Sequence, residues 1–361
     1  MGGTVSTDLN LDLQSNIPMG ERMTFTLGGG VRAAESDSKD YNLTDWRTRE
    51  RQPYIRENEG KSATFDVYAQ QEIKPWDPLR IYLGARYDDW TTYDGHSFVR
   101  NYEDKDYPTR SKGAITPKAG LSLDVLKGTT LRAAGGTAFR PPTVYELYRT
   151  YRYSTGKWTR GNPDLTPESE IGWEIGVDQE LWKGTKVSAT YFDTYLKDLI
   201  YLRTVDSTLS QRDQAKSGHS NGVELEMRSS LTSWLDVFAN YSHVDSRFVK
   251  NPGNPASEGK FLPMVPADMV SLGAQFKRGP FGLTVDAHYQ GKMYGTDTNT
   301  DRWSGVYGSY DPFFTVDAKL TYDITKNLRA TLGLDNIFNE KYYQYYLAPP
   351  FGVFGGLELK F

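Results

Sequence analysis

Apolar and polar side chains alternate along most of this chain with a period of two residues. In residues 79–88 the odd positions hold Leu, Ile, Leu, Ala and Tyr, whereas Arg80 and Arg86 occupy even positions. Residues 223–228 and 314–323 repeat this arrangement. A period of two is typical of β-strands, whose successive side chains point to opposite faces of a sheet. The pattern predicts an all-β protein of about 15 strands.

The connections between these strands alternate between short and long. Seven short ones fall near residues 15–20, 74–78, 127–129, 182–185, 231–233, 278–280 and 323–327. Seven long ones span residues 35–61, 93–112, 140–167, 198–219, 245–266, 292–311 and 337–352. Long loops that recur in this way are uncommon in compact soluble domains. The fold class predicted is therefore an antiparallel, up-and-down transmembrane β-barrel with short periplasmic turns and long extracellular loops.

Composition agrees with a membrane barrel and excludes several other classes. The mean hydropathy is -0.62, and there is no apolar run of the length, about 18 residues, that a transmembrane helix needs. A barrel strand needs an apolar residue only at every second position. The 25 Tyr and 8 Trp can line two lipid–water boundaries. The net charge of -4 argues against a nucleic acid partner, and the absence of cysteine excludes disulfides and thiolate metal sites.

The stretch of residues 131–177 contains two strand patterns separated by a long aromatic loop. Pro141 and Pro142 end the first strand because proline fixes φ and has no backbone donor. Four motifs follow each other here: Phe139-Arg140-Pro141-Pro142, then Tyr145-Glu146-Leu147-Tyr148, then Asn162-Pro163-Asp164-Leu165-Thr166-Pro167-Glu168, then Trp173-Glu174. Near the C-terminus, a further motif contains Asn336, Phe338, Tyr342 and Tyr343, and the terminal Phe361 is in phase with Leu357 and Leu359.

The order of these motifs resembles the C-terminal half of the TonB-dependent outer-membrane receptors. That family carries an F-R-A-P box, an N-P-x-L-x-P-E box, a W-E-x-G strand and an N-L-F-D-K-x-Y-Y motif, and Pro141 stands where it usually has Ala. Motifs support the resemblance over residues 60–361, and the strand pattern alone supports it before them. It implies location in the bacterial outer membrane, capture of a metal chelate, no enzymatic activity, no cofactor and a parent barrel of about 22 strands.

An odd strand count suggests part of a larger barrel, because complete bacterial barrels have an even number of strands. We expect residues 1–361 to form a single barrel domain that lacks a plug domain and about seven N-terminal strands of the family's barrel. A missing N-terminal segment or a partner chain would then close the sheet within outer-membrane lipid. The TonB complex would act on this chain only if a plug is supplied elsewhere.

The long loops supply the candidate ligand-binding residues, because tyrosine and tryptophan offer flat, amphipathic contact surface. The alternative for each is packing within a loop or a boundary belt. Arg140, Glu146, Glu168 and Glu174 are expected to be hydrogen-bonded structural positions. The ligand-binding candidates are Tyr145, Tyr148, Tyr151, Tyr153, Trp158 and Arg160 in the central loop, and Tyr294, Trp303, Tyr307 and Tyr310 in a later one.

Haem, calcium and catalysis are each disfavoured. Haem receptors of the resembling family carry a histidine between the first two boxes, but residues 143–161 contain none. Asp297, Asn299 and Asp301 have the spacing that opens a calcium loop, yet Arg302 replaces the glycine required next. The four histidines are His96, His219, His243 and His288. Two have an aspartate close by in the sequence, His96 with Asp94 and His243 with Asp245, and neither pair is predicted to be catalytic. No metal site is predicted.

The function expected from this resemblance is uptake of a ferric siderophore, a cobalamin-like ligand or another bulky chelate. Two alternatives belong to other classes. A passive outer-membrane pore without a plug would conduct ions in planar bilayers without added ligand, and a soluble β-rich binding protein would purify without detergent.

Overall fold

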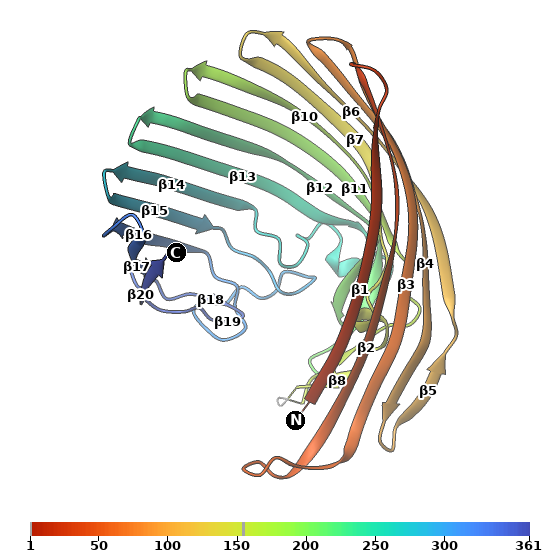
Figure 1. Cartoon of the computed structure of the whole chain (residues 1–361). Coiled ribbons are helices and arrows are strands. Elements are labelled where there is room, and N and C mark those ends of the chain that lie inside the picture. Colours follow the sequence, from red (N-terminus) through yellow and green to blue (C-terminus); the bar gives the residue numbers. More distant parts are fainter. Residues whose placement is uncertain (1, 154–155) are drawn as a thin grey trace.

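The computed structural model of the chain describes residues 2–153 and 156–361, most of which belong to one curved antiparallel sheet (Figure 1). Three of its 18 strands are short: β5 (Glu103–Tyr107), β8 (Tyr151–Arg152) and β9 (Trp158–Arg160). The other fifteen are β1 (Gly2–Pro18), β2 (Met23–Asp45), β3 (Glu50–Trp76), β4 (Leu79–Val99), β6 (Arg110–Leu126), β7 (Thr129–Arg140), β10 (Glu168–Trp182), β11 (Thr185–Thr204), β12 (Leu209–Thr232), β13 (Leu235–Lys250), β14 (Asp268–Arg278), β15 (Phe281–Gln290), β16 (Phe313–Asp323), β17 (Leu328–Asp335) and β20 (Gly352–Leu359).

Few described residues form other elements. Helix α1 (Val144–Tyr148) and the 3-10 helix η1 (Pro255–Ser257) are short, and β18 (Tyr343–Gln344) pairs with β19 (Tyr346–Leu347) in a separate sheet. No helix in the described parts of the chain has the length and apolar character needed to cross a membrane. The prediction of an antiparallel, up-and-down sheet of about 15 long strands is confirmed.

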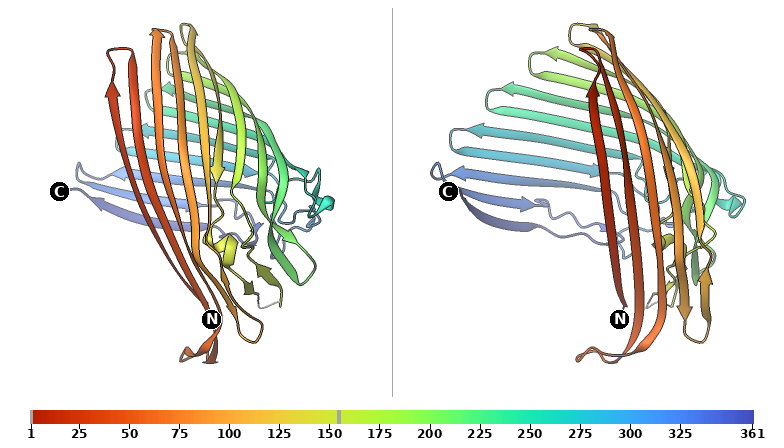
Figure 2. Two further views of the ribbon diagram at one scale, coloured as in Figure 1. Left: turned by 90° about the vertical axis from the view of Figure 1, so that its right-hand side faces the viewer. Right: turned by 45° about the vertical axis from the view of Figure 1, so that its right-hand side comes forward.

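Each long strand pairs with the next in chain order, so β4 pairs with β6, β7 with β10, and β17 with β20. Among the described residues, β1 pairs only with β2, and β20 pairs only with β17. The sheet is therefore open along two edges. Figure 2 shows the curved wall with the first and last strands at its opposite margins.

Large apolar side chains are exposed along the convex side of this wall, as the alternation predicts. Leu121, Leu225 and Leu272 are examples from three separate strands, each more than two-fifths exposed. The opposite face is polar: the Arg86 guanidinium lies 3.0 Å from Asp66 and 2.8 Å from Asp88. A wall that is apolar outside and charged inside fits a barrel with lipid around it and water within it.

The short connections lie close to their predicted positions, except that the first is shifted to residues 19–22 because Ser15 and Pro18 still pair with β2. Gly128, Gly184 and Gly279 adopt φ values of 81°, 84° and 58° in three of these turns, a conformation that glycine adopts without steric cost. The turns gather at one end of the wall, and the long connections gather at the other (Figure 1).

Three predicted loops are largely strand, so their loop assignment is wrong. In residues 35–61, β2 and β3 stay paired as far as Asp45 and Glu50, and residues 93–112 and 198–219 also lie mainly within hairpins. Residues 35–61 are largely polar on both faces, whereas residues 199–202 are an unbroken apolar run, so neither segment shows the alternation that a lipid-facing strand needs. Their main-chain hydrogen bonds nevertheless continue the ladder, which extends the wall beyond its apolar band.

Candidate ligand-binding site

The central loop, residues 141–167, folds against the concave side of the wall beside β3 and β4. Leu147 and Leu165 are almost completely buried, and with Val144 and Tyr148 they pack against Trp90 of β4. The Tyr148 hydroxyl lies 3.1 Å from the Thr92 hydroxyl. This small apolar core is separate from the lipid-facing rows and holds the loop in one position.

A capping box and a shared arginine fix the start of this loop. The Thr143 side chain accepts a hydrogen bond from the Glu146 N–H at 3.1 Å, and the Glu146 carboxylate accepts one from the Thr143 N–H at 2.9 Å. Arg140 bonds both Glu146, at 3.1 Å, and Glu168, whose carboxylate also accepts from the Ile200 N–H. The two motif boxes are thereby tied to each other across the loop.

The pKa of Glu146 reflects these contacts and makes the loop sensitive to acid. Burial opposes ionisation, but the Thr143 N–H and the Arg140 guanidinium outweigh it and hold the pKa of Glu146 below its usual value. The ionised form therefore stabilises the folded loop above the ordinary glutamate pKa, and that stabilisation is lost as pH falls through the lowered pKa.

We expect amide protection factors in residues 143–149 to fall as the pH is lowered from about 6 to about 3, because protonated Glu146 loses its ionic contacts. Hydrogen exchange, corrected for intrinsic rates, would measure this change. Glu146→Gln should reduce protection at neutral pH and flatten the dependence. An equally steep dependence in that variant would contradict the assignment to Glu146.

Other motif positions also make structural contacts. The Asn162 side chain accepts from the Asp164 N–H at 2.9 Å, and buried Asn336 exchanges hydrogen bonds with the Glu340 backbone at 2.8 and 2.9 Å. Pro142 is fully buried, and Phe139 packs against the loop core. Three aromatic motif residues have ring partners: Tyr342 stacks on Phe313 at 4.2 Å, Phe338 lies 6.4 Å from Phe314, and Trp173 lies 5.6 Å from Tyr191. The terminal Phe361, by contrast, is fully exposed.

Several candidates of the central loop gather around cations. The Arg149 guanidinium lies 4.7 Å from the ring centre of Tyr145 and 5.0 Å from that of Tyr151. The Tyr151 and Tyr153 hydroxyls are 2.7 Å apart. We call Tyr145, Arg149, Tyr151 and Tyr153 the arginine–tyrosine cluster. Burial is the largest cause that raises the pKa of Tyr145 and Tyr151, so both phenols stay neutral donors at physiological pH.

The remaining central-loop candidates lie apart from this cluster. The Arg56 and Arg152 guanidinium groups lie 5.5 and 5.6 Å from the Trp158 ring centre, and Arg160 donates to the Tyr102 hydroxyl at 2.9 Å. Tyr148 is only 3% exposed within the loop core, so its ring supports the loop.

The later-loop candidates form a second aromatic group. Tyr307 lies 5.1 Å from Tyr345 and 5.5 Å from Tyr346, and Tyr310 lies 6.2 Å from Tyr345. Tyr345 and Tyr346 are not among the sequence candidates, although only Gln344 separates them from the Tyr342-Tyr343 motif. The rings of Tyr307 and Tyr346 are largely exposed, as is that of Trp303, whereas Tyr294 stacks on Phe261.

Asp297 and Asn299 bond to another long connection, whereas Asp301 bonds within its own. Asp297 accepts from the Asn254 amide at 2.8 Å, and Asp301 accepts from the Gly295 N–H at 2.5 Å. Asn299 accepts from the Phe261 N–H at 2.8 Å and donates to the Phe261 carbonyl at 3.0 Å. Two of the three residues with calcium-loop spacing, Asp297 and Asn299, therefore join residues 291–312 to residues 251–267.

Replacing Asn299 by alanine should loosen this junction by about 1–3 kcal/mol, because both polar groups of the Phe261 backbone lose their partner. Hydrogen exchange should speed up in residues 260–266 while the strands stay protected. Thr300→Ala, at an exposed neighbouring position, is the matched control. Unchanged exchange in Asn299→Ala would show that the junction does not depend on this side chain.

The histidines do not form the dyads weighed from the sequence. His96 lies 2.8 Å from Asp106, and His243 lies 2.9 Å from Asp268. His219 pairs with Asp193 at 3.0 Å, and His288 bonds Ser271 at 3.2 Å on the concave face. The neighbouring acids Asp94 and Asp245 are instead paired with Lys61 at 3.2 Å and with Arg247 at 2.6 Å.

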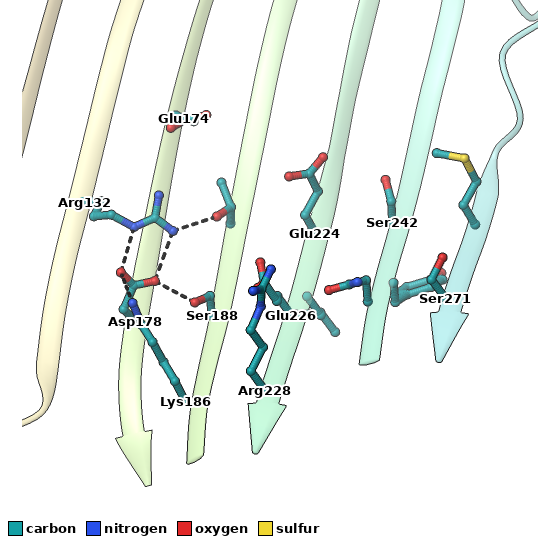
Figure 3. Close-up of a pocket in the computed structure, with 15 residues that line it drawn as sticks. Arg132, Glu174, Asp178, Lys186, Ser188, Glu224, Glu226, Arg228, Ser242 and Ser271 are labelled. Carbon is teal, nitrogen blue, oxygen red and sulfur yellow. Dashed lines mark hydrogen bonds and ion pairs between the residues drawn. The ribbon is translucent and has the colours of Figure 1, made fainter. Parts of the chain in front are cut away.

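The concave face carries a charged pocket nearer the short turns (Figure 3). Arg132 lies 3.2 Å and Lys186 3.3 Å from Asp178, which also accepts from the Ser188 hydroxyl at 2.7 Å. Glu174 and Glu224 line the same pocket, and no hydrogen bond or ion pair from the described residues reaches either carboxylate. Glu174 therefore faces the lumen, as expected, but without the expected partner.

Comparison with known proteins identifies the family. The sequence model described as "TonB dependent receptor-like, beta-barrel" matches residues 2–337. The chain is 26% identical over 293 residues to the probable TonB-dependent receptor BfrD of Bordetella pertussis, covering 77% of this chain and 36% of that protein. It is 24% identical over 315 residues to the ferripyoverdine receptor of Pseudomonas aeruginosa, covering 84% of this chain and 35% of that receptor. The chain thus spans just over a third of these relatives' lengths.

Solved structures agree on the fold. The copper transporter OprC superposes with a TM-score of 0.78 at 16% identity, covering 100% of this chain and 59% of that structure. The ferric citrate transporter FecA superposes with a TM-score of 0.72 at 16% identity, covering 100% of this chain and 55% of that structure. The chain belongs to the TonB-dependent receptor family, as part of a β-barrel of the Gram-negative outer membrane.

Proposed function

We propose that this chain forms the outer loops and part of the barrel wall of a receptor that takes up a metal chelate. The observation that carries the proposal is the arginine–tyrosine cluster, held at the loop end of a membrane wall by the buried core around Leu147. Flat phenol rings and a stacked guanidinium suit the broad, partly polar surface of a chelate. The relatives named as receptors for ferripyoverdine and ferrichrome support this ligand class.

Uptake through the wall needs parts outside this chain. Strands β1 and β20 each have a free edge among the described residues, and lipid cannot satisfy the backbone groups along such edges. A further segment of the same protein or a partner chain would close the barrel. A plug supplied with it would carry the coupling to the TonB complex.

Haem is a weaker candidate, although one relative is named heme/hemopexin utilization protein C of Haemophilus influenzae. No histidine lies in residues 143–161, and each of the four histidines already has an oxygen partner. A passive pore is the second candidate, favoured by the charged concave face around Arg132 and Asp178.

Ligand binding is the direct test of the proposed function. A ferric chelate added to the chain in detergent should quench the tryptophan fluorescence saturably, and haem should not. The double variant Tyr145→Ala/Tyr151→Ala should bind the ferric chelate at least tenfold more weakly. Tyr195→Ala, at an exposed tyrosine on the outer face, should leave it unchanged. If no ferric chelate binds saturably and the chain conducts ions strongly in bilayers, the receptor function is wrong and the passive pore is the better interpretation.

A further inference from the structure

We propose that an apolar groove on the lipid-facing side of the wall, with two lysines below it, binds one anionic phospholipid of the periplasmic leaflet. An acyl chain of the lipid lies in the groove, and its phosphate lies beside the lysines. This surface is at the end of the wall with the short turns, and its role is independent of which ligand the outer loops bind.

The groove crosses the neighbouring strands β6, β7, β10, β11 and β12. Its volume is about 590 Å³, within the range of about 300–1,000 Å³ that is usual for small-molecule sites. Leu131, Ile175 and Leu225 line it on the convex face, and each is more than two-fifths exposed. Arg132 and Thr190 also border it, but their side chains bond to each other at 3.2 Å on the concave face. The groove therefore suits a hydrocarbon chain.

The groove has about the depth of one lipid leaflet. Tyr191 lines its end away from the turns, and the Trp173 ring lies 5.6 Å from the Tyr191 ring. From Thr185, beside the turn, to Tyr191, β11 rises about 20 Å at roughly 3.3 Å per residue. With a strand tilt of about 40°, this rise corresponds to about 15 Å of membrane depth, half of a hydrocarbon core of about 30 Å. A chain that enters beside the turns would end at these two rings.

Lys127 and Lys183 lie in the two short turns below the groove. Both are exposed, and neither forms an ion pair with another described residue. The Glu180 N–H donates to the Gly128 carbonyl at 2.7 Å, so the two turns are neighbours at the rim of the wall. Glu180 follows Asp178 by two residues and so shares its concave-facing side, which leaves the positive charge of both lysines uncompensated.

The residues next to these lysines lie at the level of the lipid headgroups. Trp182 and Leu126 are 57% and 72% exposed, and an exposed tryptophan at a strand end is typical of the lipid–water boundary. Lysines at this boundary attract anionic headgroups. The apolar groove and the uncompensated charge below it match the two ends of an anionic phospholipid. A zwitterionic lipid would fill the groove but leave the lysine charge uncompensated.

Native mass spectrometry of the chain, exposed in detergent to equal amounts of phosphatidylglycerol and phosphatidylcholine with identical acyl chains, tests the inference. We expect one retained lipid, with phosphatidylglycerol favoured about fivefold. Lys127→Gln/Lys183→Gln should lower this preference below twofold. Ala133→Phe, which fills the groove, should reduce retention of both lipids at least fivefold.

Two matched controls make the same changes elsewhere on the wall. Lys277→Gln/Lys326→Gln alters exposed lysines near other short turns, and Ala274→Phe alters the outward face of β14. Both should behave as the unmodified chain, and circular dichroism should confirm that every variant keeps its strands.

Three results would each overturn the inference. Retention of both lipids without preference would remove the role of the lysines. An equal loss of preference in Lys277→Gln/Lys326→Gln would show a general attraction of anionic lipid to all the basic turns. Unchanged retention in Ala133→Phe would show that the acyl chain does not lie in the groove. None of these results bears on whether the outer loops bind a chelate.

Discussion

Replacing Leu272 by arginine is expected to weaken insertion of the chain into lipid by about 2–4 kcal/mol, the cost of an arginine on the lipid face at mid-membrane depth. Leu272 lies at the middle of β14 with its side chain exposed on the convex, apolar face. The guanidinium would have to leave water at a position where no partner is available. Folding into vesicles, titrated with urea, would measure the difference from the unmodified chain.

The control is the same change at the adjacent residue. Ser271 lies next to Leu272 but lines the charged pocket on the concave face, so Ser271→Arg should fold with a loss below about 1 kcal/mol, as expected where water is in contact with the side chain. If both variants lose the same folding free energy, then Leu272 does not face lipid and Ser271 does not face water.

The second large effect concerns the loop core. Leu147→Ala is expected to destabilise the central loop by about 2–5 kcal/mol, because Leu147 is completely buried and its truncation leaves a cavity beside Trp90 and Leu165. Ligand affinity should fall with it, since the arginine–tyrosine cluster depends on this core for its position. Limited proteolysis and hydrogen exchange in residues 141–167 would report the loss.

Leu347→Ala is the matched control for that variant. Leu347 is half exposed in another long connection, so its truncation should leave protection of the central loop unchanged. The wall itself should unfold at the same urea concentration in both variants, because the loop core is separate from the lipid-facing rows. A loop that stays equally protected in Leu147→Ala would contradict the role given to this core.

The wall could be predicted from the sequence because its determinants are local. Alternation along residues such as 79–88 identifies both the strands and their lipid-facing sides, and the short turns follow from where the alternation stops. The parts of β2 and β3 within residues 35–61 could not be recognised, because these residues are largely polar on both faces. Only the continuing ladder of backbone hydrogen bonds, which no side-chain pattern encodes, extends these strands.

The site was predicted only in part for a related reason. Tyr145, Tyr151 and Tyr153 lie in one connection, so the aromatic pattern of that connection predicts all three as candidates. Tyr345 comes from another connection and reaches Tyr307 and Tyr310 only through the fold. Tyr148 resembles its neighbours in sequence, yet it packs into the loop core because of its place on α1.

The central claim is that one face of the wall contacts lipid and the other contacts water. The accessibility of two adjacent residues on one strand tests it most directly. The chain contains no cysteine, so Glu224→Cys and Leu225→Cys each introduce a single thiol on opposite faces of β12. In the chain folded into lipid, a membrane-impermeant maleimide should label Glu224→Cys rapidly and leave Leu225→Cys unreacted, whereas a lipid-borne quencher should reach a fluorophore only at residue 225. Rapid labelling of Leu225→Cys with protection of Glu224→Cys would contradict the account.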